Sequence, residues 1–91
     1  MNLAPKEGNW EIRTRLSLTC YLLSIDFFNS GDFSEAEVVL GQAIEANPKV
    51  AEYHVARGRT RYYLGGKYRE SYEDYKRALE LGKRLLVRTQ L

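Results

Sequence analysis

The chain has 91 residues, 44% of them hydrophobic and 29% charged, which is typical of one small folded domain rather than of a disordered chain. No apolar run reaches the roughly 18 residues needed to cross a bilayer, and the segment Met1 to Lys6 lacks the apolar core of a signal peptide. The single cysteine, Cys20, excludes a disulfide within the chain and favours a reducing compartment. We therefore expect a cytoplasmic protein that does not enter a membrane.

The net charge of +2 is unevenly distributed. Residues 1–56 carry four cations and eight acids, whereas residues 57–91 carry ten cations and four acids. Such an asymmetry informs on the partners of a protein rather than on its fold.

The first predicted helix covers residues 11–29. Its apolar residues recur every three or four positions, which places them on one face: Leu16, Cys20, Leu23 and Phe27. The polar cluster that follows stops the helix, because Gly31 is free to adopt positive φ.

The second predicted helix covers residues 34–46, and its packing face carries Ala36, Leu40 and Ala43. Ser34 followed by Glu37 resembles a capping box at its start. Asn47-Pro48 ends it, because proline cannot continue a helix.

The third predicted helix covers residues 51–64 and is broken by Gly65-Gly66. The fourth begins near Tyr68. It carries Ser71, Tyr75, Ala78 and Leu79 on its packing face. Because no proline ends it, we expect it to continue past Gly82 through Leu85 and Leu86.

The chain contains an internal repeat. The order glycine, aromatic, small residue, large apolar residue and alanine that begins at Gly31 recurs 35 residues later from Gly66. A period of this size indicates stacked supersecondary units. The pattern resembles the tetratricopeptide repeat (TPR) over about residues 17–84. In the first unit the resemblance rests on Leu23, Ser24, Phe27, Gly31, Ala36, Leu40, Ala43 and Pro48, and in the second on Gly58, Tyr62, Gly66, Tyr68, Ser71, Tyr75 and Ala78.

The resemblance implies an all-α fold, in which two helix–turn–helix units stack as a short right-handed α-solenoid. The expected organisation is an N-terminal tail (1–10), a first unit with an extended first helix (11–50), a second unit (51–84) and a C-terminal helical extension (85–91). The second glycine turn arrives one residue late. We place the extra residue at Gly65-Gly66, and the alternative is a one-residue slip of the third helix.

No catalytic constellation is present in the sequence, which has one histidine, one cysteine and no recognisable metalloprotease, phosphate-loop or nucleophile-elbow motif. His54 is interpreted as a replacement for an aromatic residue in the packing face, and Cys20 as a small buried hydrophobe. We expect no enzymatic activity, no cofactor and no bound metal.

In TPR proteins the first helices of the units line a concave groove that holds a peptide or a helix of a partner. The resemblance places in this groove Leu18, Tyr21, Ile25, Phe28 and Asn29 of the first helix, and Glu52, Val55, Arg59, Tyr62 and Tyr63 of the third. Some family members hold the acidic tails of chaperones with a clamp of lysines and asparagines. The matching positions here are Tyr21 and Ile25, so that clamp is absent.

The first helix is apolar nearly all round, which is typical of a helix buried on more than one side. We expect Tyr21, Ile25 and Phe28 to be covered by a partner segment, by a second copy or by the N-terminal segment around Trp10. Ordinary packing within the chain is the competing interpretation.

Three arginines, Arg57, Arg59 and Arg61, fall within five residues. Like charges four residues apart on a helix repel each other unless acidic side chains pair with them. One alternative, which we call the internal option, is that the arginines pair with acids of the fourth helix: Glu70, Glu73 and Asp74. The other is that they pair with acids of a partner protein. We expect Arg61 to pair with an acid of this chain and Arg59 to pair with an acid of a partner. Nucleic acid is disfavoured, because the other half of the chain is acidic.

The sequence therefore predicts a protein-interaction module that docks an acidic, amphipathic peptide or helix in an apolar, aromatic groove with a basic rim. The predicted partner-binding residues are Leu18, Tyr21, Ile25, Phe28, Asn29, Val55, Arg59, Tyr62 and Tyr63. The alternative is a self-assembling structural unit, because two repeats fall below the three or so that usually suffice for stability. Head-to-tail or two-fold association would then cover the open ends.

Overall fold

The computed structural model describes the backbone of residues 9–90 and the side chains of residues 9–83. Four α-helices and no strand occur within this part of the chain. The helices are α1 (Asn9–Asn29), α2 (Phe33–Ala46), α3 (Ala51–Leu64) and α4 (Tyr68–Gln90). The all-α prediction is confirmed, and so is the continuation of α4 beyond Gly82. The first helix begins two residues earlier than expected, inside the predicted tail, whose residues 1–8 lie outside the described part.

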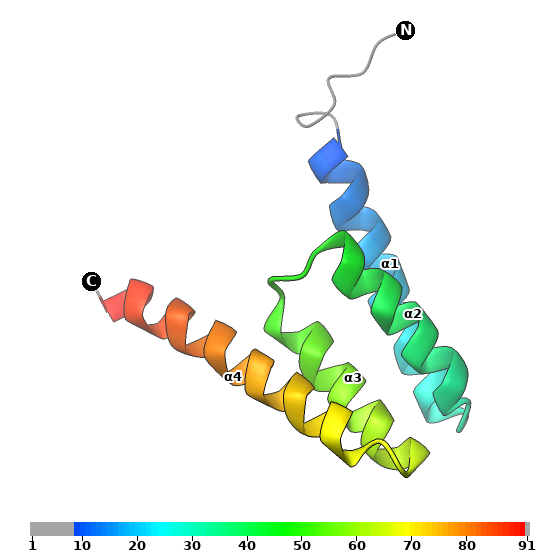
Figure 1. Ribbon diagram of the computed structural model, residues 1–91. Coiled ribbons are helices and arrows are strands. Elements are labelled where there is room, and N and C mark those ends of the chain that lie inside the picture. Colours follow the sequence, from blue (N-terminus) through cyan, green and yellow to red (C-terminus); the bar gives the residue numbers. More distant parts are fainter. Residues whose placement is uncertain (1–8, 91) are drawn as a thin grey trace, which may run out of the picture.

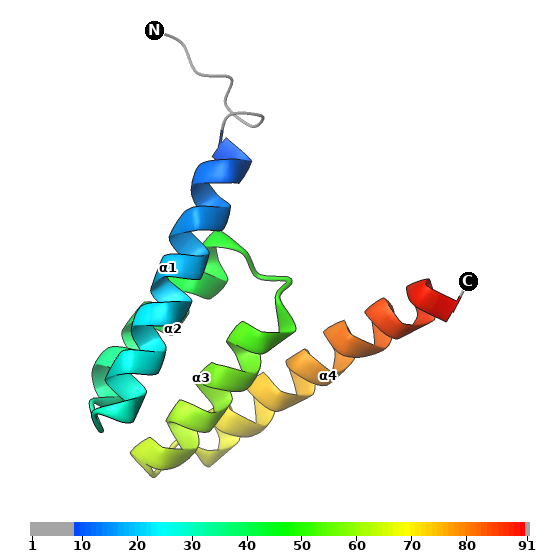
Figure 2. The same cartoon turned by 180° about the vertical axis from the view of Figure 1, so that it is seen from behind.

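The helices form two antiparallel hairpins, α1 with α2 and α3 with α4 (Figure 1). The two hairpins are joined through the contact of α2 with α3. In the view from behind, α1 and α3 lie nearest the viewer, and α2 and α4 lie behind them (Figure 2). The N-terminal end of α1 and the C-terminal half of α4 extend beyond their partner helices. Within the described residues, no helix combines the length and apolar character that a membrane span needs.

Glycine and proline fix the three connections between the helices. Gly31 has φ of 81°, and Gly65 and Gly66 have φ of 79° and 71°, a region in which side chains with a Cβ are strained. The helix α2 ends just before Asn47-Pro48, as predicted. The predicted capping box is wrong, because α2 begins after Asp32 without a side-chain cap, and Glu37 binds cations of α3 and of the following turn instead.

Small residues form the centre of the core. Ala36, Leu40 and Ala43 of α2 are buried, which confirms the predicted packing face. Cys20 of α1 and Tyr53 of α3 pack with Ala43, so this cluster joins three helices. Alanines at these positions allow the helix axes to approach closely. A larger side chain here would force neighbouring side chains or the backbone to move, which destabilises the fold.

The predicted packing face of α1 is only partly correct. Leu16 and Leu23 are exposed, and Ser17 and Ser24 are buried together with Cys20. The Ser24 hydroxyl donates a hydrogen bond of 2.6 Å to the carbonyl of Tyr21, so its burial leaves no unpaired donor. The buried face of α1 is therefore a strip of small residues against α2.

The packing face of α4 differs in the same way. Ser71, Asp74, Ala78 and Leu81 are buried, whereas Tyr75 and Leu79 are exposed. Phe27, expected in the core, is half-buried. Leu79 thus lies outside the contact with α3, and Tyr75 touches α3 only with part of its ring.

The contact between α3 and α4 depends on Gly58. A Cβ at this position would lie 3.2 Å from the Ser71 carbonyl oxygen, from the Asp74 Cβ and from a ring carbon of Tyr75. The Ser71 hydroxyl donates a hydrogen bond of 2.7 Å to the Gly58 carbonyl. Gly58 thus faces α4, which agrees with placing the extra residue in the turn at Gly65-Gly66.

Candidate partner-binding groove

Two adjoining hollows lie between α1 and α3. One of them is the more enclosed. Its lining residues are Ser24, Ile25, Phe28, Asn29, Leu40, Ala56, Arg59 and Thr60. The second is lined by Tyr21, Ala51, Glu52, Val55, Ala56 and Arg59. Because Ala56 and Arg59 border both, we treat them as one groove, the α1–α3 groove.

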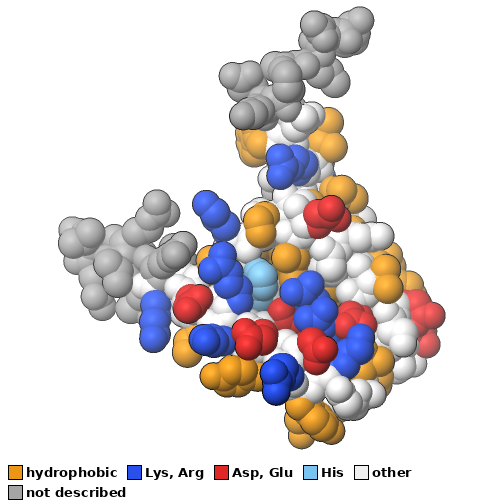
Figure 3. All heavy atoms as spheres, in the orientation of Figure 1, with side chains coloured by type: hydrophobic (Ala, Val, Ile, Leu, Met, Phe, Trp, Pro, Cys, Tyr) orange, Lys and Arg blue, Asp and Glu red, His pale blue; other side chains and the backbone are white. Residues whose placement is uncertain are grey.

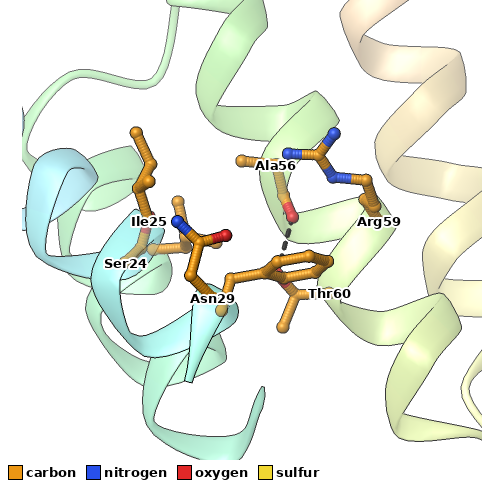
Figure 4. A pocket seen from close by; sticks show the side chains of 8 residues that line it. Ser24, Ile25, Asn29, Ala56, Arg59 and Thr60 are labelled. Carbon is orange, nitrogen blue, oxygen red and sulfur yellow. Dashed lines mark hydrogen bonds between the residues drawn. The ribbon is translucent and has the colours of Figure 1, made fainter. Parts of the chain in front are cut away.

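The floor of the groove offers few free hydrogen-bonding groups. The Thr60 hydroxyl donates to the Ala56 carbonyl at 2.8 Å (Figure 4), and Ser24 is bonded to its own helix. Both polar side chains on the floor are therefore satisfied internally. A ligand here would gain free energy mainly from apolar contact.

One end of the groove is an aromatic wall. The Phe28 ring packs edge-on against Phe33 and Tyr63, with centroids 5.1 Å and 5.3 Å away, and Phe33 stacks on Tyr63 at 5.6 Å. Tyr62 joins the wall at its exposed end, 5.7 Å from Tyr63. These contacts join the end of α1 and the start of α2 to the end of α3, and they hold Phe28 in place.

Tyrosines close the other end. The Tyr21 and Tyr53 rings lie 5.1 Å apart, and the Tyr53 hydroxyl is 3.1 Å from the buried Ser17 hydroxyl. Tyr21 and Phe28 are thus half-buried by their own chain, whereas Ile25 between them is exposed.

Arg59 is the cation of the groove. Its guanidinium carbon lies 5.0 Å from the centroid of the Phe28 ring, within the range of a cation–π interaction. Among the described side chains, no carboxylate forms an ion pair with it. Arg59 lies opposite Ile25 and Asn29 across the hollow (Figure 4). The guanidinium is held over an aromatic face while its remaining donors are free to meet an anion.

The other two arginines are used internally. Arg57 binds the Asp74 carboxylate at 2.9 Å, and Arg61 binds Asp74 at 3.0 Å and Glu37 at 2.8 Å. Lys67 completes the network at 3.0 Å from Glu37. Basic and acidic side chains gather where α2, α3 and α4 meet (Figure 3). The internal option for Arg61 is confirmed, but of the three acids expected only Asp74 takes part, since Glu70 and Glu73 form no ion pair among the described residues.

Opposing effects act on the Glu37 carboxylate. Partial burial alone would raise its pKa, but hydrogen bonds from Arg61 and Lys67 and the charges of these residues outweigh this effect, and the pKa lies below the ordinary value of 4.5. Glu37 of α2 is thus held as an anion between α3 and the turn that follows it.

Most of the predicted site residues are brought together. Tyr21, Ile25, Phe28, Asn29, Val55 and Arg59 line the groove, as does Glu52. Leu18 lines neither hollow and is exposed on α1, about one helical turn before Tyr21. Tyr62 and Tyr63 belong to the aromatic wall. The sequence interpretation missed Ser24, Leu40, Ala51, Ala56 and Thr60, whose side chains are small or buried and carry no separate signal.

Of the three covers expected for Tyr21, Ile25 and Phe28, the N-terminal segment around Trp10 does not use Trp10 itself, and residues 1–8 of that segment lie outside the described part of the chain. Trp10 is exposed in the first turn of α1. It lies 15 residues from Ile25 along the same helix, which corresponds to about 22 Å at a rise of 1.5 Å per residue. Cover by a partner or by a second copy stays a prediction.

The two residues with reactive side chains are buried away from the groove. His54 has its Nε2 2.8 Å from the Pro48 carbonyl oxygen, which fits the tautomer that donates from Nε2, and its buried Nδ1 has no partner among the described residues. The Cys20 thiol lies 3.8 Å from Gln42 Oε1. No group of three or more potential metal ligands occurs in the described part of the chain.

Comparison of the chain with protein-family models, with curated proteins and with solved structures finds no match.

Proposed function

We propose that the chain is a protein-interaction module of two TPR-like units, which docks an acidic, amphipathic segment of a partner protein in the α1–α3 groove. Support for the TPR assignment comes from the 35-residue offset of the sequence pattern and from the two successive helical hairpins. The proposed role is binding rather than catalysis.

The observation that carries the proposal is the composition of the groove. Ile25 on α1 and Val55 on α3 expose apolar side chains across a floor whose hydroxyls are already bonded. Arg59 borders both hollows, and among the described residues no carboxylate, including that of Glu52 in the same hollow, forms an ion pair with it. Exposed apolar side chains next to a cation that has no ion pair suit a ligand that presents an apolar side chain beside an acidic one.

The open shape of the groove favours a peptide over a metabolite. The hollows are open and border one another along the helices, so that successive side chains of a bound segment would occupy them in turn. The aromatic wall and the Tyr21–Tyr53 pair limit the segment at either end. Aromatic contacts of this type dominate the energetics of many protein interfaces.

Selection from a random peptide library displayed on phage tests the proposal. The chain is immobilised, and enriched peptides are measured in solution against four variants. We expect acidic residues next to apolar ones in the enriched peptides. Ile25→Glu and Arg59→Glu should each weaken binding by about tenfold or more, equivalent to about 1.4 kcal/mol.

Matched controls are available on other faces. Val38→Glu introduces a charge at an exposed apolar position of α2, and Arg69→Glu reverses an exposed cation of α4. Both should bind like the wild type. No enrichment of peptides, or binding that all four variants retain equally, would contradict the proposal.

A further inference from the structure

Each end of the helix array exposes an apolar strip. On α4 the strip consists of Tyr68, Tyr72, Tyr75 and Leu79, which we name the α4 strip. On α1 it consists of Ile12, Leu16 and Leu23, which we name the α1 strip. The spacings of three, four and seven residues place the members of each strip on one helical face. Neither strip belongs to the α1–α3 groove.

The α4 strip corresponds to a face of α2 that is covered. An offset of 35 residues relates its members to Phe33, Glu37, Leu40 and Ile44 of α2. Leu40 is 1% exposed, Glu37 binds Arg61 of α3, and Phe33 stacks on Tyr63 of α3. The equivalent Tyr72 and Leu79 are 62% and 63% exposed. The α4 strip is thus the face on which a helix equivalent to α3 is missing.

Part of the α1 side that carries the α1 strip corresponds in turn to residues that pack toward α2 from α3 and from the residue before it. Ser24 of α1 and Gly58 of α3 are buried small residues that lie 34 residues apart, and Gly58 is the residue through which α3 meets α4. The same offset relates Leu16 to Val50, which, like Ile44, packs against the three-helix cluster. Leu16, together with Phe27, which corresponds to Arg61, therefore marks the side of α1 that would lie on α4 as α3 lies on α2. Leu23, one turn before Phe27, corresponds to Arg57, and Ile12 belongs to the part of α1 that extends beyond the position equivalent to the start of α3.

The side chains at the paired positions match in chemistry. Inside the chain, Glu37 pairs with Arg61. The corresponding residues at the two ends are Tyr72 and Phe27, so an ion pair is replaced by two aromatic rings. Val50 and Ile44, which pack on the same cluster inside the chain, correspond to Leu16 and Leu79, so aliphatic side chains are again matched by aliphatic ones.

The lengths of the end helices agree with the same arrangement. By these offsets α1 extends eight residues before the position equivalent to the start of α3, and α4 extends nine residues beyond the position equivalent to the end of α2. Because α2 and α3 run in opposite directions, both extensions would lie at the same end of an α4–α1 contact. Each extension would then run beside the other.

We propose that copies of this chain stack head to tail, with the α1 strip of one copy on the α4 strip of the next. Charge favours this over a two-fold contact. The α1–α2 hairpin carries two cations and six acids, and the α3–α4 hairpin carries ten cations and five acids. Head-to-tail stacking places hairpins of opposite charge together, whereas a two-fold contact places like charges together.

Sedimentation velocity from micromolar to millimolar concentration tests the proposal. The mass of the wild type should rise with concentration beyond that of a dimer, because a head-to-tail contact leaves both ends open. Leu16→Glu blocks one end and Leu79→Glu the other. Each variant alone should stay monomeric, and their equimolar mixture should form a dimer and stop there, because one intact α4 strip meets one intact α1 strip.

Val38→Glu is the matched control, since Val38 is 60% exposed on α2 and belongs to neither strip. It should assemble like the wild type. Circular dichroism establishes that each variant keeps its helices, and Ile12→Glu and Tyr72→Glu provide a second blocking variant at each end. A wild type that stays monomeric, a mixture that does not pair, or dimers of Leu16→Glu alone would each overturn the proposal, the last by indicating a two-fold contact through α4.

Discussion

Asp74 is the residue whose loss should destabilise the second hairpin most. Its carboxylate is 5% exposed and accepts hydrogen bonds from Arg57 Nη2 at 2.9 Å, Arg57 Nε at 3.1 Å and Arg61 Nη1 at 3.0 Å. Asp74→Asn keeps the shape of the side chain but removes the charge, and it turns an amide donor toward guanidinium donors. The change therefore tests the ion network with little effect on packing.

The expected cost follows from burial. Removing one partner of a fully buried ion pair costs about 3–5 kcal/mol. The side chains of Arg57 and Arg61 are 21% exposed and can regain some hydration, and Arg61 keeps Glu37 as a partner. We therefore expect a loss of about 2–3 kcal/mol in the free energy of unfolding, the size of one or two charged hydrogen bonds. For a domain of this length the Tm should fall by about 10 °C or more.

Urea and thermal unfolding followed by circular dichroism measure the effect. Glu73→Gln is the matched control, because Glu73 is the preceding residue, is exposed and forms no ion pair among the described residues. It should change the free energy of unfolding by no more than about 0.5 kcal/mol. An Asp74→Asn variant as stable as Glu73→Gln would refute the reasoning that this network holds α3 on α4.

Three further outcomes are expected. Ala43→Trp should lower the free energy of unfolding in urea by about 1–3 kcal/mol, because Ala43 is fully buried between three helices. An unchanged unfolding midpoint would contradict the close packing described for Ala43. Gly58→Val should lower the Tm, since even a Cβ would lie 3.2 Å from the Ser71 carbonyl oxygen. A Tm equal to that of the wild type would contradict a tight contact between α3 and α4 at this position. Glu37 has a folded pKa below 4.5, so its contribution is present above that pH and is lost as the pH falls through the folded value; the stability difference between wild type and Glu37→Gln should shrink in acid, and a constant difference would argue against the ion network.

Helix boundaries could be predicted well from the sequence because local chemistry determines them. Gly31 and Gly65-Gly66 allow positive φ, and Pro48 ends α2, so the turns were placed without tertiary information. Ala36 and Ala43 were also recognised, because small residues at helical spacing indicate close helix contact.

The buried face of α1 could not be predicted in the same way. That helix is apolar nearly all round, so hydrophobic periodicity does not distinguish its faces, and Leu16 was predicted buried when Ser17 is. A serine whose hydroxyl bonds within its own helix is small enough for a close contact and leaves no unpaired group. Size, rather than hydrophobicity, selected the buried side.

The arginine pairing could be predicted only in part. Asp74 was among the acids expected from the spacing of α3 and α4, but Glu37 comes from another hairpin and was interpreted as a helix cap. A single sequence does not bring α2 and the end of α3 together. Arg59 was separated correctly from its neighbours, because it lies on another face of the same helix.

The most direct test of the α1–α3 groove is amide chemical-shift mapping by NMR with the tightest peptide from the library selection. Titration should shift the amides of Ile25, Asn29, Val55 and Arg59, and added salt should weaken the complex, because charges interact over only about 8–10 Å at physiological ionic strength. Arg59→Glu should abolish these shifts while Arg69→Glu retains them. Shifts confined to the exposed face of α4, or binding indifferent to both salt and Arg59→Glu, would contradict the assignment of the groove.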